Sequence, residues 1–159
     1  TATERLMDIE NIAQEKANTP TKLLPSVGVQ LSNLTFQYTT SSRLIFNNFS
    51  YSFPAGSITA IVGETGAGKT TLIRLLLSLI QPTEGKIALI DGSGKEFTMC
   101  PDLRANFAYV PQGNTLFSGT IRSNLLLGKP DATDEELKTA LHTAAADFVY
   151  KKAKGLETP

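Results

Sequence analysis

A glycine-rich segment at residues 63–70 has the clearest chemistry in this sequence. It reads GETGAGKT and lies between two apolar runs, the first strand-like and the second helix-like. Glycines followed by lysine and threonine at this spacing are typical of a phosphate-binding loop, in which backbone N–H groups surround a polyphosphate. Lys69 is expected to reach the β- and γ-phosphates, and the Thr70 hydroxyl to hold Mg²⁺. The sequence therefore predicts a nucleotide site made of Gly63, Glu64, Thr65, Gly66, Ala67, Gly68, Lys69, Thr70 and Thr71.

The elements on either side of this loop should position it. Ile58–Val62 is a short apolar run, which predicts a strand covered on both faces of a parallel sheet. Lys69–Ile80 is apolar on most sides, so we expect a helix that packs into the interior. The N-terminal end of such a helix favours negative charge, because its first N–H groups are unpaired and its dipole is positive there. Strand, loop and helix together predict a phosphate cradle.

The remaining strands are expected on both sides of this unit. Val27–Tyr38 and Leu44–Phe53 are rich in β-branched and aromatic residues and predict an antiparallel hairpin. Ile87–Ile90 and Phe107–Val110 predict two further strands. The dipeptide at residues 91–92 is Asp-Gly, which indicates a hairpin turn after the first of these two strands.

Helices are expected after residue 112. Residues 118–120 offer N-caps for a short helix that runs through Leu127 and ends at Gly128. Thr133 and Glu136 have the spacing of a capping box that opens a longer helix. Its apolar stripe consists of Leu137, Ala140, Leu141, Ala144, Ala145, Phe148 and Val149, and its basic end of Lys151, Lys152 and Lys154. We interpret these lysines as complements of the helix dipole, since they have no interleaved aromatic residues that would favour nucleic acid.

Composition limits the classes of function. The chain has 159 residues, 41% of them hydrophobic, and its 15 basic and 15 acidic residues cancel. Bulk electrostatics therefore gives no reason to expect nucleic acid as a partner. The single cysteine, Cys100, excludes an internal disulfide. No apolar run approaches the roughly 18–20 residues that span a bilayer.

Two residues resemble catalytic groups without fitting the role. Asp91 follows an apolar strand, as a metal-binding carboxylate does in many nucleotide hydrolases, but Gly92 makes a turn the better interpretation. His142 lies off the apolar stripe of its helix and is interpreted as a solvated residue with no partner carboxylate nearby. The sequence thus predicts a phosphate cradle without an evident general base.

A series of motifs, in order along the chain, resembles the nucleotide-binding domain of ATP-binding-cassette transporters of the exporter type. The motifs are Tyr38 within LTFQY, the phosphate loop, PTEG at 82–85, IDG at 90–92, Leu103-Arg104, YVPQ at 109–112, LFSGTI at 116–121 and Asn124. The resemblance implies that Tyr38 stacks on adenine. Such stacking requires only a π surface on the base. It also implies that Gln112 reaches Mg²⁺ and the attacking water, so that Lys69 and Gln112 are the catalytic residues and Thr70 and Gln112 the metal ligands. The implied cofactors are ATP and Mg²⁺.

The same resemblance implies the fold class and its divisions. The fold is an α/β P-loop NTPase core with an N-terminal antiparallel β-subdomain and the start of a helical subdomain. Residues 1–17 resemble the amphipathic helix that leads from a membrane domain, and 18–26 a linker. The ATP-binding core and β-subdomain occupy 27–111, and the glutamine loop and helical subdomain occupy 112–159. A plain amphipathic linker remains an alternative for residues 1–17.

The resemblance also implies partners and a location. They are a second nucleotide-binding domain, a transmembrane domain of the same polypeptide, and the cytoplasmic face of a membrane. The family's signature loop, catalytic glutamate and switch histidine are not found in these 159 residues. We therefore expect a truncated cassette, favour a fragment over a naturally shortened form, and expect ATP binding without useful hydrolysis.

Two other functions stay open at this point. A stand-alone P-loop kinase or GTPase would share the loop, although no guanine-reading Asn-Lys-x-Asp pattern is found. A non-catalytic interaction module could keep the loop as structure alone.

Overall fold

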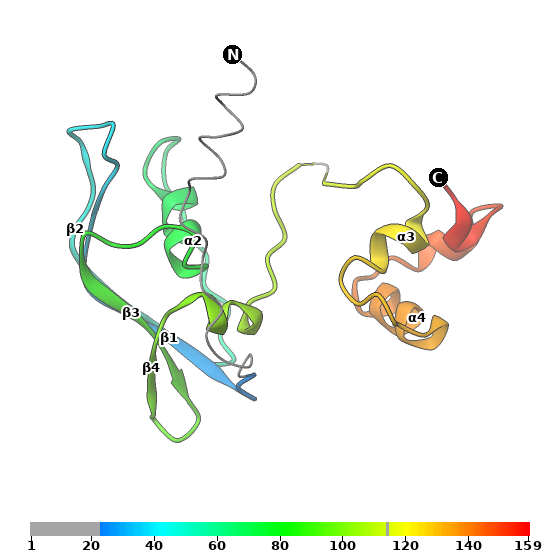
Figure 1. Ribbon diagram of the computed structural model, residues 1–159, viewed down its shortest axis with the longest axis horizontal. Coiled ribbons are helices and arrows are strands. Elements are labelled where there is room, and N and C mark those ends of the chain that lie inside the picture. The colour runs from blue at the N-terminus through cyan, green and yellow to red at the C-terminus, as the bar shows by residue number, and fades with distance from the viewer. Residues whose placement is uncertain (1–22, 114) are drawn as a thin grey trace, which may run out of the picture. The chain divides into compact units, whose positions relative to one another are not determined.

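The computed structural model describes residues 23–113 and 115–159, and the chain divides into two compact units (Figure 1). The first unit extends to Tyr109, and the second runs from Val110 to Pro159. The helix expected over 1–17 and the part of the linker over 18–22 lie outside the described residues.

Within the described residues, four strands form one antiparallel sheet in the order β2-β1-β3-β4. β1 is Val27–Gln37 and β2 is Leu44–Phe53, so the hairpin predicted over these segments is confirmed. β3 is Glu84–Asp91 and β4 is Glu96–Thr98. β1 is central because it pairs with β2 on one side and with β3 on the other; Leu31 lies opposite Tyr51 and Ile87.

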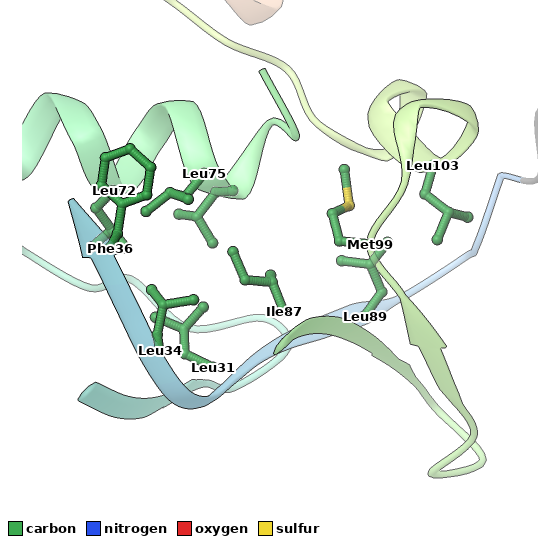
Figure 2. Close-up of a cluster of buried hydrophobic side chains, with 10 residues drawn as sticks. Leu31, Leu34, Phe36, Leu72, Leu75, Ile87, Leu89, Met99 and Leu103 are labelled. Atoms are coloured by element: carbon green, nitrogen blue, oxygen red, sulfur yellow. The ribbon is translucent and has the colours of Figure 1, made fainter. Parts of the chain in front are cut away.

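The core of the first unit lies between this sheet and helix α2, Lys69–Leu76. Figure 2 shows Leu72 and Leu75 of α2 directed toward Leu34 of β1 and Ile87 of β3. Apolar side chains at these spacings meet because one face of the strand and one stripe of the helix each lose water on contact. The buried members of the cluster are Leu31, Leu34, Phe36, Leu72, Leu75, Leu76, Ile87, Leu89, Met99 and Leu103.

α2 is four residues shorter than predicted. The helix ends because Ser78 has φ 53°, a left-handed conformation, and the Leu79 N–H donates to the Arg74 carbonyl at 2.9 Å. This six-to-one bond is the Schellman ending of a helix. The prediction of a helix continuing to Ile80 is therefore wrong, because the chain leaves the helical path at Ser78.

Arg104 closes the same end of α2 from the 3₁₀ helix η1, Pro101–Asn106. Its Nε donates to the Leu77 carbonyl at 2.7 Å, and its Nη2 donates to the Ser78 carbonyl at 3.0 Å. The last carbonyls of a helix have no partner within the helix, so a half-buried guanidinium that meets two of them joins η1 firmly to α2.

Two predicted strands are wrong. Ile58–Val62 and Phe107–Val110 have no strand structure, and Ile58 is 102% and Val62 89% exposed. Both runs are apolar enough for buried parallel strands, but among the described residues the sheet is wholly antiparallel and neither run belongs to it. An apolar run forms a strand only when a neighbouring strand supplies its backbone hydrogen bonds.

The second unit is helical. α3 is Ile121–Leu125, and the Thr120 side chain accepts a hydrogen bond from the Ser123 N–H as its N-cap. α4 is Asp134–Thr143, and both bonds of the capping box predicted for Thr133 and Glu136 are present. The 3₁₀ helices η2 and η3 follow at Asp147–Lys151 and Gly155–Glu157.

Arg122 connects the helices of this unit. Its Nη1 and Nη2 donate to the Asp134 carboxylate at 2.5 and 3.1 Å, and its Nε donates to Glu157 Oε1 at 2.6 Å. A guanidinium has a planar fork of donors, so one side chain on α3 can meet the start of α4 and the η3 segment together.

α4 is shorter than its apolar stripe predicts. Ala145 has φ 52°, and the Ala146 N–H donates to the Leu141 carbonyl at 2.8 Å, which ends the helix. Val149 is still buried, but from η2, whereas Phe148 is exposed. The predicted single helix through Val149 is thus wrong. The spacing that suggested a continuous stripe comes from two consecutive elements.

Candidate nucleotide-binding site

The predicted phosphate loop is an exposed turn that runs directly into α2. Within it, the Ala67 N–H donates to the Glu64 carbonyl at 3.2 Å. Gly66 has φ 84° and Gly68 has φ 99°, a region that side chains rarely adopt. A Cβ on Gly68 would lie 2.6 Å from Ile45 Cγ2, so glycine is required there for space as well as for conformation.

Lys69 folds back over this turn. Its Nζ donates to the carbonyls of Gly63 and Glu64 at 2.6 and 2.7 Å. An ammonium has three N–H donors, so these two bonds leave a third for an anion. The side chain therefore places a positive charge over the loop and pins the start of the loop to the start of α2.

The N-terminus of α2 has the chemistry of an anion site. Its N-cap is Gly68, no side chain caps it, and its first turn contains no acidic residue. The first N–H groups of a helix lack partners within it, so at this end their partial positive charges remain available. Together with the two left-handed glycines and Lys69, these donors fit a phosphate group.

Thr70 and Thr71 differ in exposure within this first turn. Thr70 is exposed, whereas Thr71 is buried. Among residues 23–113 and 115–159, no three His, Cys, Asp or Glu residues gather as metal ligands. A Mg²⁺ that accompanies a nucleotide needs few protein ligands, because phosphate oxygens and water supply the others, and an exposed hydroxyl such as that of Thr70 fits that requirement.

The structure brings Tyr38 to the same helix. Its hydroxyl oxygen lies 3.2 Å from Thr71 Oγ1, and Arg74 Nη1 donates to it at 3.4 Å. The Thr71 hydrogen bond, and secondarily Arg74, lowers the pKa of Tyr38 below its usual value. The ring lies 4.9 Å from that of Phe36 at 85°, an edge-to-face arrangement. Tyr38 is half-buried.

Arg74 is a member of this cluster that the sequence did not predict. It lies three residues after Thr71, and residues three apart occupy the same side of a helix. That spacing was a signal for a shared face. It did not indicate that Tyr38, 36 positions earlier, would meet the same face.

Gln112 belongs to the second unit, where it is exposed in a segment without regular structure. Its assignment as a metal ligand and catalytic residue stays a prediction. The roles of the loop residues and of Tyr38 also stay predictions, although the structure places all of these residues in the first unit.

The two residues interpreted as unsuited to catalysis have structural partners. Asp91 Oδ1 accepts hydrogen bonds from the backbone N–H groups of Ser93 and Lys95 at 2.9 and 3.0 Å, which confirms its interpretation as a turn residue. His142 Nδ1 lies 3.1 Å from Asp147 Oδ2, with both side chains largely exposed. The expectation that no carboxylate is near His142 is therefore wrong. Asp147 reaches it because α4 ends early and the chain turns back.

Comparison with known proteins gives consistent matches. A family model described as ABC transporter matches residues 46–156. The chain is 45% identical over 147 residues to the beta-(1→2)glucan export ATP-binding/permease protein NdvA of Bartonella bacilliformis, a match that covers 91% of the chain and 24% of that protein. It is 35% identical over 159 residues to the uncharacterized ABC transporter ATP-binding protein YfiC of Bacillus subtilis, with 98% and 26% covered.

A solved structure is also similar. It is that of a bacterial Atm1-family ABC exporter with ATP bound, with a TM-score of 0.77, 32% sequence identity, and coverage of 99% of the chain and 27% of the exporter. The chain spans about a quarter of the length of the curated relatives it matches. Within the part of the chain that the structure describes, no helix has both the length and the apolar character needed to cross a membrane.

Proposed function

The chain belongs to the ABC transporter family, within its nucleotide-binding domain, and we propose that it binds Mg-ATP as part of an exporter. The observation that supports this most directly is the cradle formed by the loop 63–68, Lys69 and the uncapped start of α2. All three place positive charge or N–H donors at the same exposed part of the surface. A polyphosphate is the ligand whose chemistry matches that set.

Each residue of the cradle has a distinct task in this proposal. The backbone N–H groups of the loop and of the first turn of α2 hold the phosphate oxygens. The Lys69 ammonium would reach the β- and γ-phosphate oxygens, and the Thr70 hydroxyl would hold the metal ion. The Mg²⁺ supplies neutralisation of phosphate charge, which is the main chemical demand of phosphoryl transfer. From the family resemblance alone, Gln112 is proposed as the residue that would contact the metal and the attacking water.

The base is held by Tyr38 in this proposal. An aromatic ring that stacks on a base contributes about 1–3 kcal/mol by alanine substitution, so Tyr38→Ala should weaken ATP binding about five- to hundredfold. The matched control is Tyr150→Ala, which removes an exposed tyrosine of the second unit. This variant should leave ATP affinity unchanged.

Calorimetric titrations with Mg-ATP and Mg-GTP test this assignment. We expect measurable ATP binding that depends on Tyr38 and no marked preference for GTP. If Tyr38→Ala binds ATP as tightly as the unsubstituted chain, Tyr38 is not the adenine platform. A strong preference for GTP would instead favour a GTPase.

The whole transporter is proposed by extension from the relatives. Proteins related to the chain are named as ATP-binding/permease proteins for export, so we infer a transmembrane domain in the same polypeptide and a second nucleotide-binding domain as partner. The chain would then lie at the cytoplasmic face of a membrane, and the intact protein would be an ATPase that couples ATP binding and hydrolysis to transport.

The 159-residue chain on its own is expected to bind ATP without cleaving it at a useful rate. Most of the catalysis of phosphoryl transfer is positioning and charge stabilisation, and these 159 residues contain no evident carboxylate to position water. A phosphate-release assay checks this expectation. The expectation would be contradicted if the unsubstituted chain released phosphate continuously and the Lys69→Ala variant did not.

A further inference from the structure

The hydroxyl group of Tyr38 has two partners on one helix, and the nucleotide-binding proposal uses neither contact. Thr71 Oγ1 lies 3.2 Å away and Arg74 Nη1 lies 3.4 Å away. Thr71 is 7% exposed, whereas Arg74 is exposed. The phenol is therefore tied to α2 by one buried hydroxyl and one charged donor.

We propose that Arg74, together with Thr71, is a positioning residue that holds the Tyr38 ring in the orientation required to receive an adenine base. This inference rests on the proposed function, because it assigns Arg74 a task in the same site. Arg74 acts through Tyr38 and has no contact with the nucleotide.

The backbone around Tyr38 explains why such a restraint matters. Tyr38 is the first residue after β1 ends at Gln37, and the chain turns immediately, with the Ser41 N–H donating to the Tyr38 carbonyl at 3.0 Å. A side chain at the end of a strand has lost one strand neighbour that would otherwise limit its rotation. The Phe36 ring restrains Tyr38 from one direction, by an edge-to-face contact at 4.9 Å.

The contacts at the hydroxyl supply the other restraint. A phenol held at its Cβ end by the backbone and at its hydroxyl end by α2 has the direction of its long axis fixed. The edge-to-face contact with Phe36 then limits rotation of the ring about that axis. Stacking on a ring that is already oriented avoids the entropy of ordering it during binding, which commonly costs about 0.5–1.5 kcal/mol for one side chain. The Thr71 hydrogen bond, and secondarily Arg74, lowers the pKa of Tyr38.

A double-mutant cycle separates this role from a general structural one. Tyr38→Phe keeps the stacking ring and removes the hydroxyl, and Arg74→Leu removes the donor. Each should weaken Mg-ATP binding about two- to tenfold, the range of one net hydrogen bond. The double variant should be no weaker than Tyr38→Phe alone, because Arg74 acts only through the hydroxyl. Arg74→Lys, which keeps a donor, should recover part of the affinity.

A second titration uses inorganic tripolyphosphate with Mg²⁺ in place of ATP. Arg74→Leu should leave tripolyphosphate affinity unchanged, whereas Lys69→Ala should weaken both ligands. Lys138→Gln removes one positive charge from an exposed position on α4 and should change neither. If Arg74→Leu does not fold, Arg74→Met, which also lacks a donor, carries the same measurements.

Three results would overturn the inference. They are unchanged ATP affinity in Arg74→Leu, additive losses in the cycle, and an equal loss of ATP and tripolyphosphate affinity, which would place Arg74 on the phosphates. In all three the unsubstituted chain still binds ATP and depends on Tyr38, so the proposed function survives. Absence of ATP binding by the unsubstituted chain would remove both proposals.

Discussion

In the predicted phosphate loop, Gly68 leaves space for a close approach of the backbone and Lys69 supplies positive charge. Gly68 has no room for a Cβ beside Ile45, and its φ of 99° is unfavourable for a side chain. Lys69, the next residue, holds the carbonyls of Gly63 and Glu64 with its ammonium. The backbone of the loop can therefore approach a ligand closely, while the charge is already close to the place where phosphate would bind.

Arg104 is the residue whose structural contribution is easiest to test. Arg104→Ala leaves the Leu77 and Ser78 carbonyls without the guanidinium at the half-buried end of α2. Hydrogen bonds to charged groups contribute about 1.5–3 kcal/mol, so we expect the free energy of unfolding to fall by about that amount. Urea unfolding followed by circular dichroism measures it.

Arg104→Lys is the control for this substitution. One ammonium can replace one of the two contacts, so the loss should be smaller than for alanine. A change below about 0.5 kcal/mol for Arg104→Ala would show that the cap contributes no more than an ordinary surface contact.

Helices α2 and α4 are each followed by a residue other than glycine in the left-handed region. Ser78 has φ 53° after α2, and Ala145 has φ 52° after α4. Glycine is the usual residue at this position because it has no Cβ to strain. Both helices therefore end where the sequence carries no glycine to mark the end.

Ala145→Gly should stabilise the second unit. The substitution removes the strain of a Cβ at positive φ, and we expect a gain of about 0.5–1 kcal/mol in the free energy of unfolding. Urea denaturation is the measurement. The matched control is Ala140→Gly inside α4, which should lower stability by about 1 kcal/mol because glycine is a poor helix former. A loss of stability in Ala145→Gly would contradict the assigned helix ending.

The capping box of α4 predicts a dependence on pH. Lys129, and secondarily the Thr133 N–H, lowers the pKa of Glu136 from 4.5 to about 2. A carboxyl whose pKa is lower in the folded state stabilises it above the unfolded pKa, and this contribution is lost as pH falls toward the folded pKa. The helical signal of the second unit should thus weaken between about pH 4.5 and pH 2.

Glu136→Gln should remove much of that dependence, measured as ellipticity at 222 nm across the same pH range. Glu135→Gln, one residue earlier in the same first turn, should leave it in place. Because Glu136 is at the surface, added salt should reduce the effect. Equal pH profiles for Glu136→Gln and the unsubstituted chain would contradict the role of this carboxylate.

At the scale of the whole chain, local signals were predictable and long-range partners were not. The hairpin of β1 and β2, the turn at Asp91 and the capping box at Thr133 each depend on residues close in sequence, and all three are present. Ile58–Val62 and Phe107–Val110 depend on partners elsewhere. Both runs are apolar, but they form no strands, because no neighbouring strand pairs with them among the described residues.

The same distinction applies to the site. The loop and the start of α2 follow from a motif of contiguous residues, so their geometry was predictable. The contact between Tyr38 and Arg74 joins positions 36 apart. It depends on the packing of α2 against β1, which local sequence patterns do not specify. Gln112 lies in the second unit, and its role remains a prediction.

Calorimetric titration of Mg-ATP into the unsubstituted chain and into Lys69→Ala tests the central claim most directly. The loss of charge-assisted hydrogen bonds should weaken binding roughly ten- to hundredfold in Lys69→Ala, with Lys138→Ala unchanged as the control. Circular dichroism of both variants confirms that they fold. Equal affinity of Lys69→Ala and the unsubstituted chain, or no binding by either, would contradict the assignment of residues 63–70 as an ATP-binding loop.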